Sequence, residues 1–378
     1  MVAEPLKHQI GSDVVYAIGA SITAVHPAFD TDAFAAACLA GLEELELTAR
    51  AQHISDVLAS HLPDDEATAI RILIDSLGPE AGDGDGDSWG NSAFFYWPHT
   101  RFITDRGLTN FDLAMEAQIA LTKRFTSEFS IRNYLLHHPE QTMLRLHEWA
   151  DDDNVHVRRM VSEGTRPRLP WAARLPGFQR DPAPVIELLE KLKDDPEEYV
   201  RRSVANNLND IAKDHPQVVI ELAERWWARG DANRRRLVRH GLRTLIKAAN
   251  PEALAVLGFG PESPAEISKV TIDPNSASIG DKVRITVEVH NPATADAGAL
   301  VDLRFWFVKS NGKTSPKVFK GAELQIAAGA TALVRKTISL AQHSTRKHYP
   351  GTQTVEVVLN GVSHQGGTFE LAATDGAI

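Results

Sequence analysis

A short segment near the middle of the chain combines residue types that could act on charged groups. Glu163 supplies a carboxylate and Trp171, eight positions later, a large aromatic ring. Three arginines accompany them: Arg159, Arg166 and Arg168. A carboxylate can stabilise positive charge or accept a proton, and arginines suit phosphate groups. The simpler interpretation is the end of a helix, with solvated charges and a tryptophan in the core.

The local pattern predicts how this segment is positioned. The residues before Gly164 have the spacing of an amphipathic helix. Its apolar positions are Val157, Met160 and Val161. Gly164 is expected to end this helix. Pro167 and Pro170 then predict a stiff, extended exit, since each lacks a backbone donor and disfavours helix in the residue before it.

Length and composition indicate a globular protein of two or three domains. The chain has 378 residues, of which 43% are hydrophobic and 24% charged. The single cysteine, Cys38, excludes an intramolecular disulfide framework and suits a reducing compartment. We see no signal-peptide pattern and no apolar run of membrane-spanning length. A cytoplasmic protein without a membrane partner is therefore expected.

The charge is distributed unevenly along the chain. The formal net charge is −10, which by itself argues against a nucleic-acid partner. Residues 1–80 hold three Lys or Arg against thirteen Asp or Glu, whereas residues 123–247 hold twenty-three against nineteen. Because a phosphate backbone responds to local charge, the basic segment keeps DNA binding open.

An internal repeat lies within the helical part of the chain. Residues 151–162 match residues 194–205 at a displacement of 43 positions, and residues 231–242 and 126–135 are weaker copies. A period of roughly 40–47 residues with two helices per copy is typical of HEAT repeats, which stack into a curved solenoid. Stacking should align the repeated arginines as a stripe along one face: Arg158, Arg159, Arg201, Arg202, Arg235, Arg236, Arg239 and Arg243.

Beyond residue 260 the pattern changes to strands. Apolar residues alternate with polar ones at Val283, Ile285, Val287 and Val289. About seven such strands in roughly 110 residues predict an immunoglobulin-like sandwich. We therefore predict a multidomain α + β chain, with an all-α HEAT-like repeat solenoid over residues 1–260 and an all-β immunoglobulin-like sandwich over residues 265–378.

No motif in the sequence predicts a metal or a cofactor. Asp83, Asp85 and Asp87 alternate with glycine like the start of a calcium loop, but Ser88 and Phe94 stand where that loop needs glycine and glutamate. The His137–His138 pair has no further patterned ligands. There is also no phosphate-binding glycine loop or dinucleotide fingerprint.

Several motifs together resemble the AlkC branch of the DNA alkylation repair glycosylases. The most specific is the string Glu-Gly-Thr-Arg-Pro-Arg-Leu-Pro-Trp at residues 163–171. The others lie at residues 3–7, 26–30, 125–132 and 206–210. The resemblance covers essentially the whole chain, because one subgroup of that branch carries a C-terminal immunoglobulin-like domain.

The resemblance implies a monofunctional DNA glycosylase that removes cationic bases such as 3-methylcytosine and 3-methyladenine from duplex DNA without flipping them. The family's catalytic acids fall on Glu128, Glu163 and Asp210, and its aromatic wall falls on Trp171. The expected protein is a monomer without cofactors. The expected DNA contacts are Arg159, Arg166, Arg168, Arg202, Arg236, Arg239 and Arg243, with Arg346 and Lys347 on a loop of the sandwich.

Two other functions fit the same sequence. A HEAT-like scaffold could bind proteins without catalysis, and an accessory protein could bind lesions without releasing the base. Each acidic residue also has a simpler interpretation as half of an ion pair on a helix surface. These pairs would be Glu128 with Arg132, Glu163 with Arg159, and Asp210 with Lys213.

Overall fold

A computed structural model describes residues 5–80, 91–343 and 347–373 of the chain. The residues considered for a calcium loop, Asp83, Asp85 and Asp87, and the predicted DNA contact Arg346 therefore lie outside the described residues. The chain divides into two compact units. The helical unit comprises Met1–Val219 and Gly230–Gly241, and the sandwich unit comprises Ile220–Arg229 and Leu242–Ile378.

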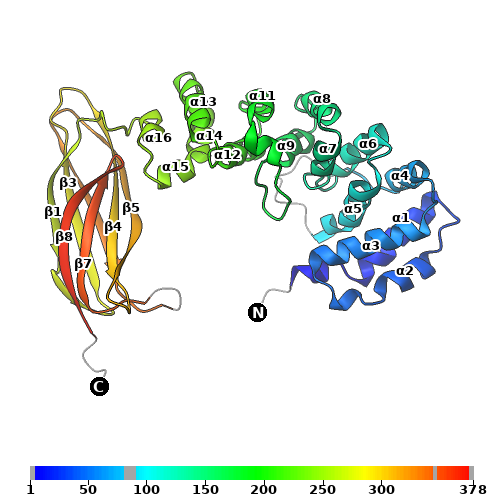
Figure 1. The fold of residues 1–378 in the computed structure, drawn as a ribbon, viewed down its shortest axis with the longest axis horizontal. Helices are drawn as coiled ribbons and strands as arrows, with labels where there is room; N and C mark the ends of the chain where they lie inside the picture. Colours follow the sequence, from blue (N-terminus) through cyan, green and yellow to red (C-terminus); the bar gives the residue numbers. More distant parts are fainter. Residues whose placement is uncertain (1–4, 81–90, 344–346, 374–378) are drawn as a thin grey trace. The chain divides into compact units, whose positions relative to one another are not determined.

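The helical unit begins with a layer of antiparallel helices and continues as stacked helix pairs (Figure 1). The first part contains α1 (Ser12–Val25), α2 (Thr31–Leu39), α3 (Leu47–His61), α4 (Glu66–Asp75), α5 (Trp97–Arg106) and α6 (Phe111–Thr122). The second part contains α7 (Ile131–His137), α8 (Pro139–Trp149), α9 (Val155–Gly164), α10 (Pro176–Arg180), α11 (Ala183–Leu192), α12 (Glu198–Ile211) and α14 (Ala232–Gly241). Short 3-10 turns lie at Leu6–Gln9, Leu42–Glu44 and Asn91–Tyr96.

The repeat predicted from the sequence corresponds to stacked helices. The two matching segments form α9 and α12, and α12 packs against both α9 and α14. Apolar residues at equivalent positions, Val161 on α9 and Val204 on α12, are fully buried in this stack. The HEAT-like architecture is therefore confirmed.

The first arginine of each repeated pair does not contribute to an exposed stripe. Arg158 Nη1 donates to the carbonyls of Asp152 and Asp153, at 2.8 and 2.9 Å. Arg201 Nη1 donates to the carbonyl oxygens at the same offsets, those of Asp195 and Pro196, the latter at 2.7 Å. Both arginines thus hold the loop that precedes their own helix, which corrects the expectation that all the repeated arginines face outward.

The sandwich unit contains two antiparallel sheets with one additional parallel edge pairing (Figure 1). One sheet has the order β1-β3-β6 and the other β2-β8-β7-β4-β5. The strands are β1 (Glu266–Asp273), β2 (Ser276–Ser278), β3 (Lys282–His290), β4 (Ala297–Val308), β5 (Thr314–Ile326), β6 (Thr331–Ser339), β7 (Gly351–Leu359) and β8 (Val362–Ala372). The predicted immunoglobulin-like sandwich is confirmed.

Alternation along the strands builds the core of the sandwich. Val283, Ile285, Val287 and Val289 on β3 are at most 1% exposed, as the sequence pattern predicted. They pack with aromatic residues of the facing sheet, such as Phe305, whose ring lies 5.5 Å from a second phenylalanine ring on β4. One face of every strand therefore supplies the core, as in other packed sheets.

Helices also belong to the same unit as the sheets. They are most of α13 (Pro216–Ala228), α15 (Arg243–Lys247) and α16 (Pro251–Val256). Leu254 on α16 and Phe259 after it form a small apolar cluster with Leu300 of β4. Gly298 permits this contact, because a Cβ atom there would lie 2.5 Å from the carbonyl oxygen of Gly258.

Within the described residues, no helix is long and apolar enough to cross a bilayer. The same part of the chain contains no group of three or more His, Cys, Asp or Glu side chains placed to hold a metal ion.

Candidate active site

Helix α9 is fixed at both ends by residues of its own sequence. Asn154 caps its start by accepting hydrogen bonds from two backbone N–H groups of the first turn, at 2.9 and 3.3 Å. The helix ends at Gly164, as predicted. A Cβ atom at that position would lie 2.5 Å from Ile131 Cγ2, so the glycine lets α7 approach closely. Glu163 is thereby held beside α7 with 6% of its surface exposed.

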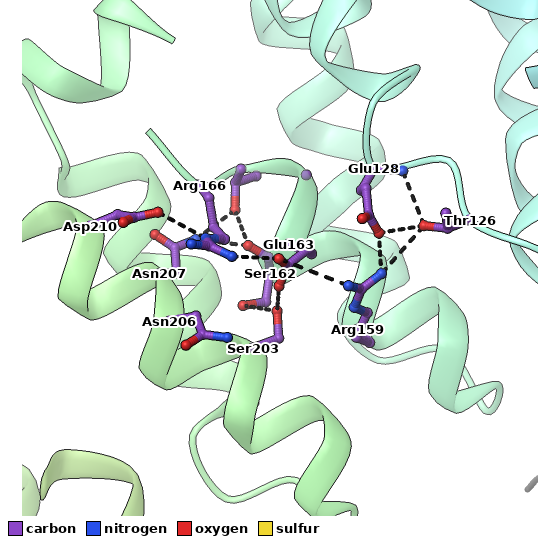
Figure 2. A network of polar contacts seen from close by, with 12 residues as sticks. Thr126, Glu128, Arg159, Ser162, Glu163, Arg166, Ser203, Asn206, Asn207 and Asp210 are labelled. Carbon is purple, nitrogen blue, oxygen red and sulfur yellow. Dashed lines mark hydrogen bonds and ion pairs between the residues drawn. The ribbon is translucent and has the colours of Figure 1, made fainter. Parts of the chain in front are cut away.

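Three carboxylates from separate parts of the helical unit meet in one polar network (Figure 2). Glu128 lies in the turn before α7, Glu163 at the end of α9 and Asp210 near the end of α12. All three are buried, with 8%, 6% and 1% of their surface exposed, respectively. The structure thus brings together the three acids that the family resemblance implied as catalytic.

Two arginines link these carboxylates into a chain. Arg159 pairs closely with Glu128 Oε2, and its Nη2 lies 3.8 Å from Glu163 Oε1. Arg166 bridges the other two acids, with 2.6 Å from Nη1 to Glu163 Oε1 and 2.8 Å from Nε to Asp210 Oδ2. Both arginines were predicted to contact DNA, but in this structure their guanidinium groups bind the acidic residues.

The electrostatics of this network favour the ionised form of Glu163. Lys213 Nζ lies 2.8 Å from Asp210 Oδ1, so three acids face three cations. Burial raises the pKa of Glu163, whereas the charges of Arg159 and Arg166 lower it. A hydrogen bond from another side chain lowers it further, and the resulting pKa lies below the ordinary value of 4.5. Glu163 is therefore negatively charged at neutral pH.

Hydroxyl groups also donate hydrogen bonds to Glu163 and Glu128. Ser203 Oγ donates to Glu163 Oε2 over 2.6 Å. Thr126 Oγ1 donates to Glu128 Oε2, the oxygen that also meets Arg159. Each of these carboxylates is therefore oriented by a neutral donor as well as by a cation.

The simpler ion-pair interpretations are correct in part. Asp210 does pair with Lys213, and Glu163 does lie within reach of Arg159. The predicted pairing of Glu128 with Arg132 is wrong. Glu128 precedes α7 instead of lying on it, so helical spacing does not bring the two side chains together.

Arg132 instead holds the loop between α9 and α10. Its Nη1 donates to the carbonyl oxygens of Gly164 (3.0 Å) and Arg166 (2.7 Å), and its Nε donates to that of Ala173 (3.2 Å). Arg132 is 4% exposed, and burial together with the charge of Arg166 lowers its pKa to about 10. This buried arginine fixes the backbone on both sides of the tryptophan.

Trp171 lies in that loop and is 92% exposed, which excludes the interpretation as a core tryptophan. Its φ angle is +63°, a conformation that strains a bulky residue by roughly 1–3 kcal/mol. Pro167 lies in a turn, so the predicted extended exit is wrong. The loop folds back on itself, with Leu175 N–H donating to the carbonyl of Pro167 over 3.2 Å.

The other predicted DNA contacts differ in their surroundings. Arg168 Nε lies 2.9 Å from Asp214 Oδ2, so this guanidinium also binds a carboxylate. Arg202 on α12 and Arg236 on α14 are exposed and line a pocket of about 170 Å³ with His240. These two arginines therefore offer a basic surface between neighbouring copies of the repeat.

The remaining predicted DNA contacts lie on α14, at the start of α15 and in the loop between β6 and β7. Arg239 on α14 is partly exposed. Arg243 begins α15 in the sandwich unit and is also partly exposed. Lys347 is exposed and lines a pocket of about 220 Å³ together with Lys309 and Lys317.

Several residues that build the site were not singled out from the sequence. Besides Arg132 and Ser203, Asn207 Nδ2 donates to the carbonyl of Ser162 over 2.8 Å and joins α12 to α9. The position of Ser203 in the second copy of the repeat could have drawn attention to it, since equivalent faces of stacked helices adjoin.

Known protein families match both the helical part and the sandwich of this chain. Residues 125–247 match a family described as "DNA alkylation repair enzyme". Residues 266–373 match the C-terminal Ig-like domain of the uncharacterised protein YhaZ. A solved structure of the alkylpurine DNA glycosylase AlkC from Pseudomonas fluorescens, bound to DNA with an abasic-site analogue, is 35% identical, with a TM-score of 0.77. The chain belongs to the AlkC-type DNA alkylation repair family.

The similarity to this family extends over both units. The match with AlkC covers 98% of the present chain and 100% of the AlkC chain. This AlkC-type protein is also 33% identical to YhaZ of Bacillus subtilis over 318 residues, or 84% of its own length and 85% of the relative's. The family resemblance inferred from the sequence is therefore confirmed.

Proposed function

We propose that this protein is a monofunctional DNA glycosylase that hydrolyses the N-glycosidic bond of cationic alkylated bases in duplex DNA. The proposed substrates include 3-methylcytosine and 3-methyladenine. The observation that carries the proposal is the meeting of Glu128, Glu163 and Asp210 in one buried network. Membership of the AlkC-type family supports DNA as the partner, since the related AlkC was solved with DNA.

The chemistry of cationic bases explains why carboxylates suffice. A base alkylated at a ring nitrogen already carries positive charge and leaves as a neutral molecule, so no acid has to protonate it. The enzyme must instead stabilise positive charge on the sugar and position a water molecule. A negatively charged Glu163 supports the first task, because its pKa lies below the ordinary value.

The paired arginines answer an electrostatic difficulty. Unpaired carboxylates at a DNA-binding surface would repel the phosphate backbone. Here Arg159 and Arg166 place positive charge beside the acids at short range, and their charges lower the pKa of Glu163. Arg202 and Arg236, which face solvent, are then our candidates for phosphate contacts, and binding should weaken steeply with salt.

Exposed Trp171 supports excision without base flipping. An aromatic residue that walled a deep pocket would be covered, whereas this side chain is 92% exposed. We propose that its ring approaches the cationic base or sugar from outside the stack, an interaction of about 1–2 kcal/mol when desolvated. Since water is the nucleophile, no amine is required and the DNA strand stays intact.

The test is single-turnover release of base from duplex DNA carrying one 3-methylcytosine. The parent protein should release the base and leave an uncleaved abasic strand. Glu163→Gln and Asp210→Asn should lower the rate by about 100-fold or more. DNA affinity should stay unchanged in both variants, which separates catalysis from binding.

The same experiment distinguishes the alternatives. An accessory protein would bind the lesion duplex selectively and release no base. A scaffold would bind DNA no more tightly than its charge provides, again without release. Matched duplexes carrying a neutral lesion serve as the control, because a base that must leave as an anion should be a poor substrate.

A further inference from the structure

The six oxygen atoms of the three carboxylates are not equally engaged. Five accept a hydrogen bond or ion pair from side chains that the structure describes. Those five are Glu163 Oε1 (Arg166, 2.6 Å), Glu163 Oε2 (Ser203, 2.6 Å), Asp210 Oδ2 (Arg166, 2.8 Å), Asp210 Oδ1 (Lys213, 2.8 Å) and Glu128 Oε2 (Arg159). Among the described residues, none donates to Glu128 Oε1.

Glu128 also has the greatest access to solvent of the three. Its side chain is 11% exposed, compared with 8% for Glu163 and 2% for Asp210. It lies in a turn before α7, whereas the other two lie on helices packed on both sides. Glu128 thus combines partial solvent exposure with an oxygen, Oε1, to which no described side chain donates.

We propose that Glu128 is the base that activates the attacking water, through Oε1, while Glu163 and Asp210 stabilise charge on the sugar. This inference rests on the proposed glycosylase function. An oxygen that already accepts a hydrogen bond is a poorer proton acceptor, and among the described residues Glu128 Oε1 is the one of the six oxygens that accepts none. Arg159 and Thr126, both bound to Oε2, orient the carboxylate so that Oε1 stays available.

The step balances without any further reactant. The bond from the sugar C1′ to the base nitrogen breaks, and its electron pair neutralises the cationic base. A bond forms from the water oxygen to C1′, and one water proton passes to Glu128 Oε1. The products are a neutral base, an abasic sugar and a proton that the carboxylate then returns to solvent.

Chemical rescue separates a base from an electrostatic stabiliser. Azide is an anionic nucleophile that needs no deprotonation, so it can replace water where a base has been removed. We would compare full-length parent, Glu128→Gln, Glu128→Ala and Glu163→Gln in single-turnover release of 3-methylcytosine. Sodium azide would be tested against sodium chloride at equal ionic strength, with the DNA products analysed by mass spectrometry.

The expected result is a loss of about 100-fold or more in both Glu128 variants. Azide should restore Glu128→Ala by roughly tenfold or more and give a glycosyl azide product, with no such rescue of Glu163→Gln. Thermal unfolding and DNA affinity measured in parallel verify that each variant is folded and binds DNA.

Two results would overturn the assignment while leaving the proposed function intact. One is a folded Glu128→Gln variant with a rate within about threefold of an active parent. The other is an azide effect that does not distinguish the Glu128 variants from Glu163→Gln, because azide rescues both equally or neither. Absence of release by the parent would instead overturn the glycosylase proposal itself.

Discussion

Arg166 reaches from the loop after α9 to α12 and donates from Nε to Asp210 Oδ2 over 2.8 Å, across 44 positions of sequence. The same guanidinium binds Glu163, so one side chain fixes the spacing between two of the proposed catalytic acids. The backbone of Arg166 is also fixed, because its carbonyl oxygen accepts a hydrogen bond from buried Arg132. The separation of the two acids is thus set by one rigid planar group.

Replacing this bridge should be costly for stability. Arg166→Met leaves Glu163 and Asp210 without their shared cation, and breaking a buried ion pair in this way typically destabilises by about 3–5 kcal/mol. Urea denaturation would measure the free energy of unfolding of each variant. The matched control is Arg168→Met, which removes a more exposed pair with Asp214 and should change stability by about 1 kcal/mol or less. Equal losses in the two variants would contradict the bridging role.

The lowered pKa of Glu163 predicts a dependence of stability on pH. Because its folded-state pKa lies below the ordinary 4.5, its ionised form adds stability above about pH 4.5. That contribution is lost as the pH falls through the folded-state pKa. The difference in unfolding free energy between the parent and Glu163→Gln should therefore narrow as the pH falls from neutral to below 4.5. A difference that stays constant over this range would refute the assigned shift.

Trp171 should matter for catalysis and not for folding. Its side chain buries almost no surface, so Trp171→Ala should leave the unfolding free energy within about 0.5 kcal/mol of the parent. Loss of an interaction of about 1–2 kcal/mol with the cationic substrate should slow base release by about 5- to 30-fold. Trp171→Phe should recover part of the rate. A strong loss of stability in Trp171→Ala would show that the ring packs against the protein.

The basic pocket between α12 and α14 should affect DNA binding. Arg202→Gln and Arg236→Gln are each expected to weaken binding to all sequences and to reduce the slope of log affinity against log salt by about 1. Arg234→Gln, on α14 beside Arg236, is the control, since Arg234 pairs with Asp194 and does not line this pocket. Fluorescence anisotropy at several salt concentrations would measure the slopes, and an unchanged slope in both pocket variants would exclude phosphate contact there.

Much of the fold followed from periodicity. The displacement of 43 positions predicted stacked copies of one helical repeat, and alternation on β3 predicted its buried face. Gly164 was correctly placed at the end of its helix. These features depend on the pattern along one element, which the sequence contains in full.

The partners of the arginines could not be predicted in the same way. Arg159 and Arg166 looked like phosphate ligands because basic charge is visible in a sequence and its partner is not. The long, flexible side chains reach acids on other elements, so the stacking of α7, α9 and α12 decides which pairs form. For Glu128 the spacing rule failed because the helix begins only at Ile131.

The hydrogen bonds from Arg158 and Arg201 to the loops before their helices bear on how such a repeat array can lengthen. Each of these hydrogen bonds lies within its own copy of the repeat, between a helix and the loop that precedes it. Arg158 also reaches Asp195 at the start of the following copy, at 2.6 Å. A duplicated segment of this length would therefore carry the contacts that fix its own introductory loop. In evolution or in design, each inserted copy would bring a loop and a helix that are already joined.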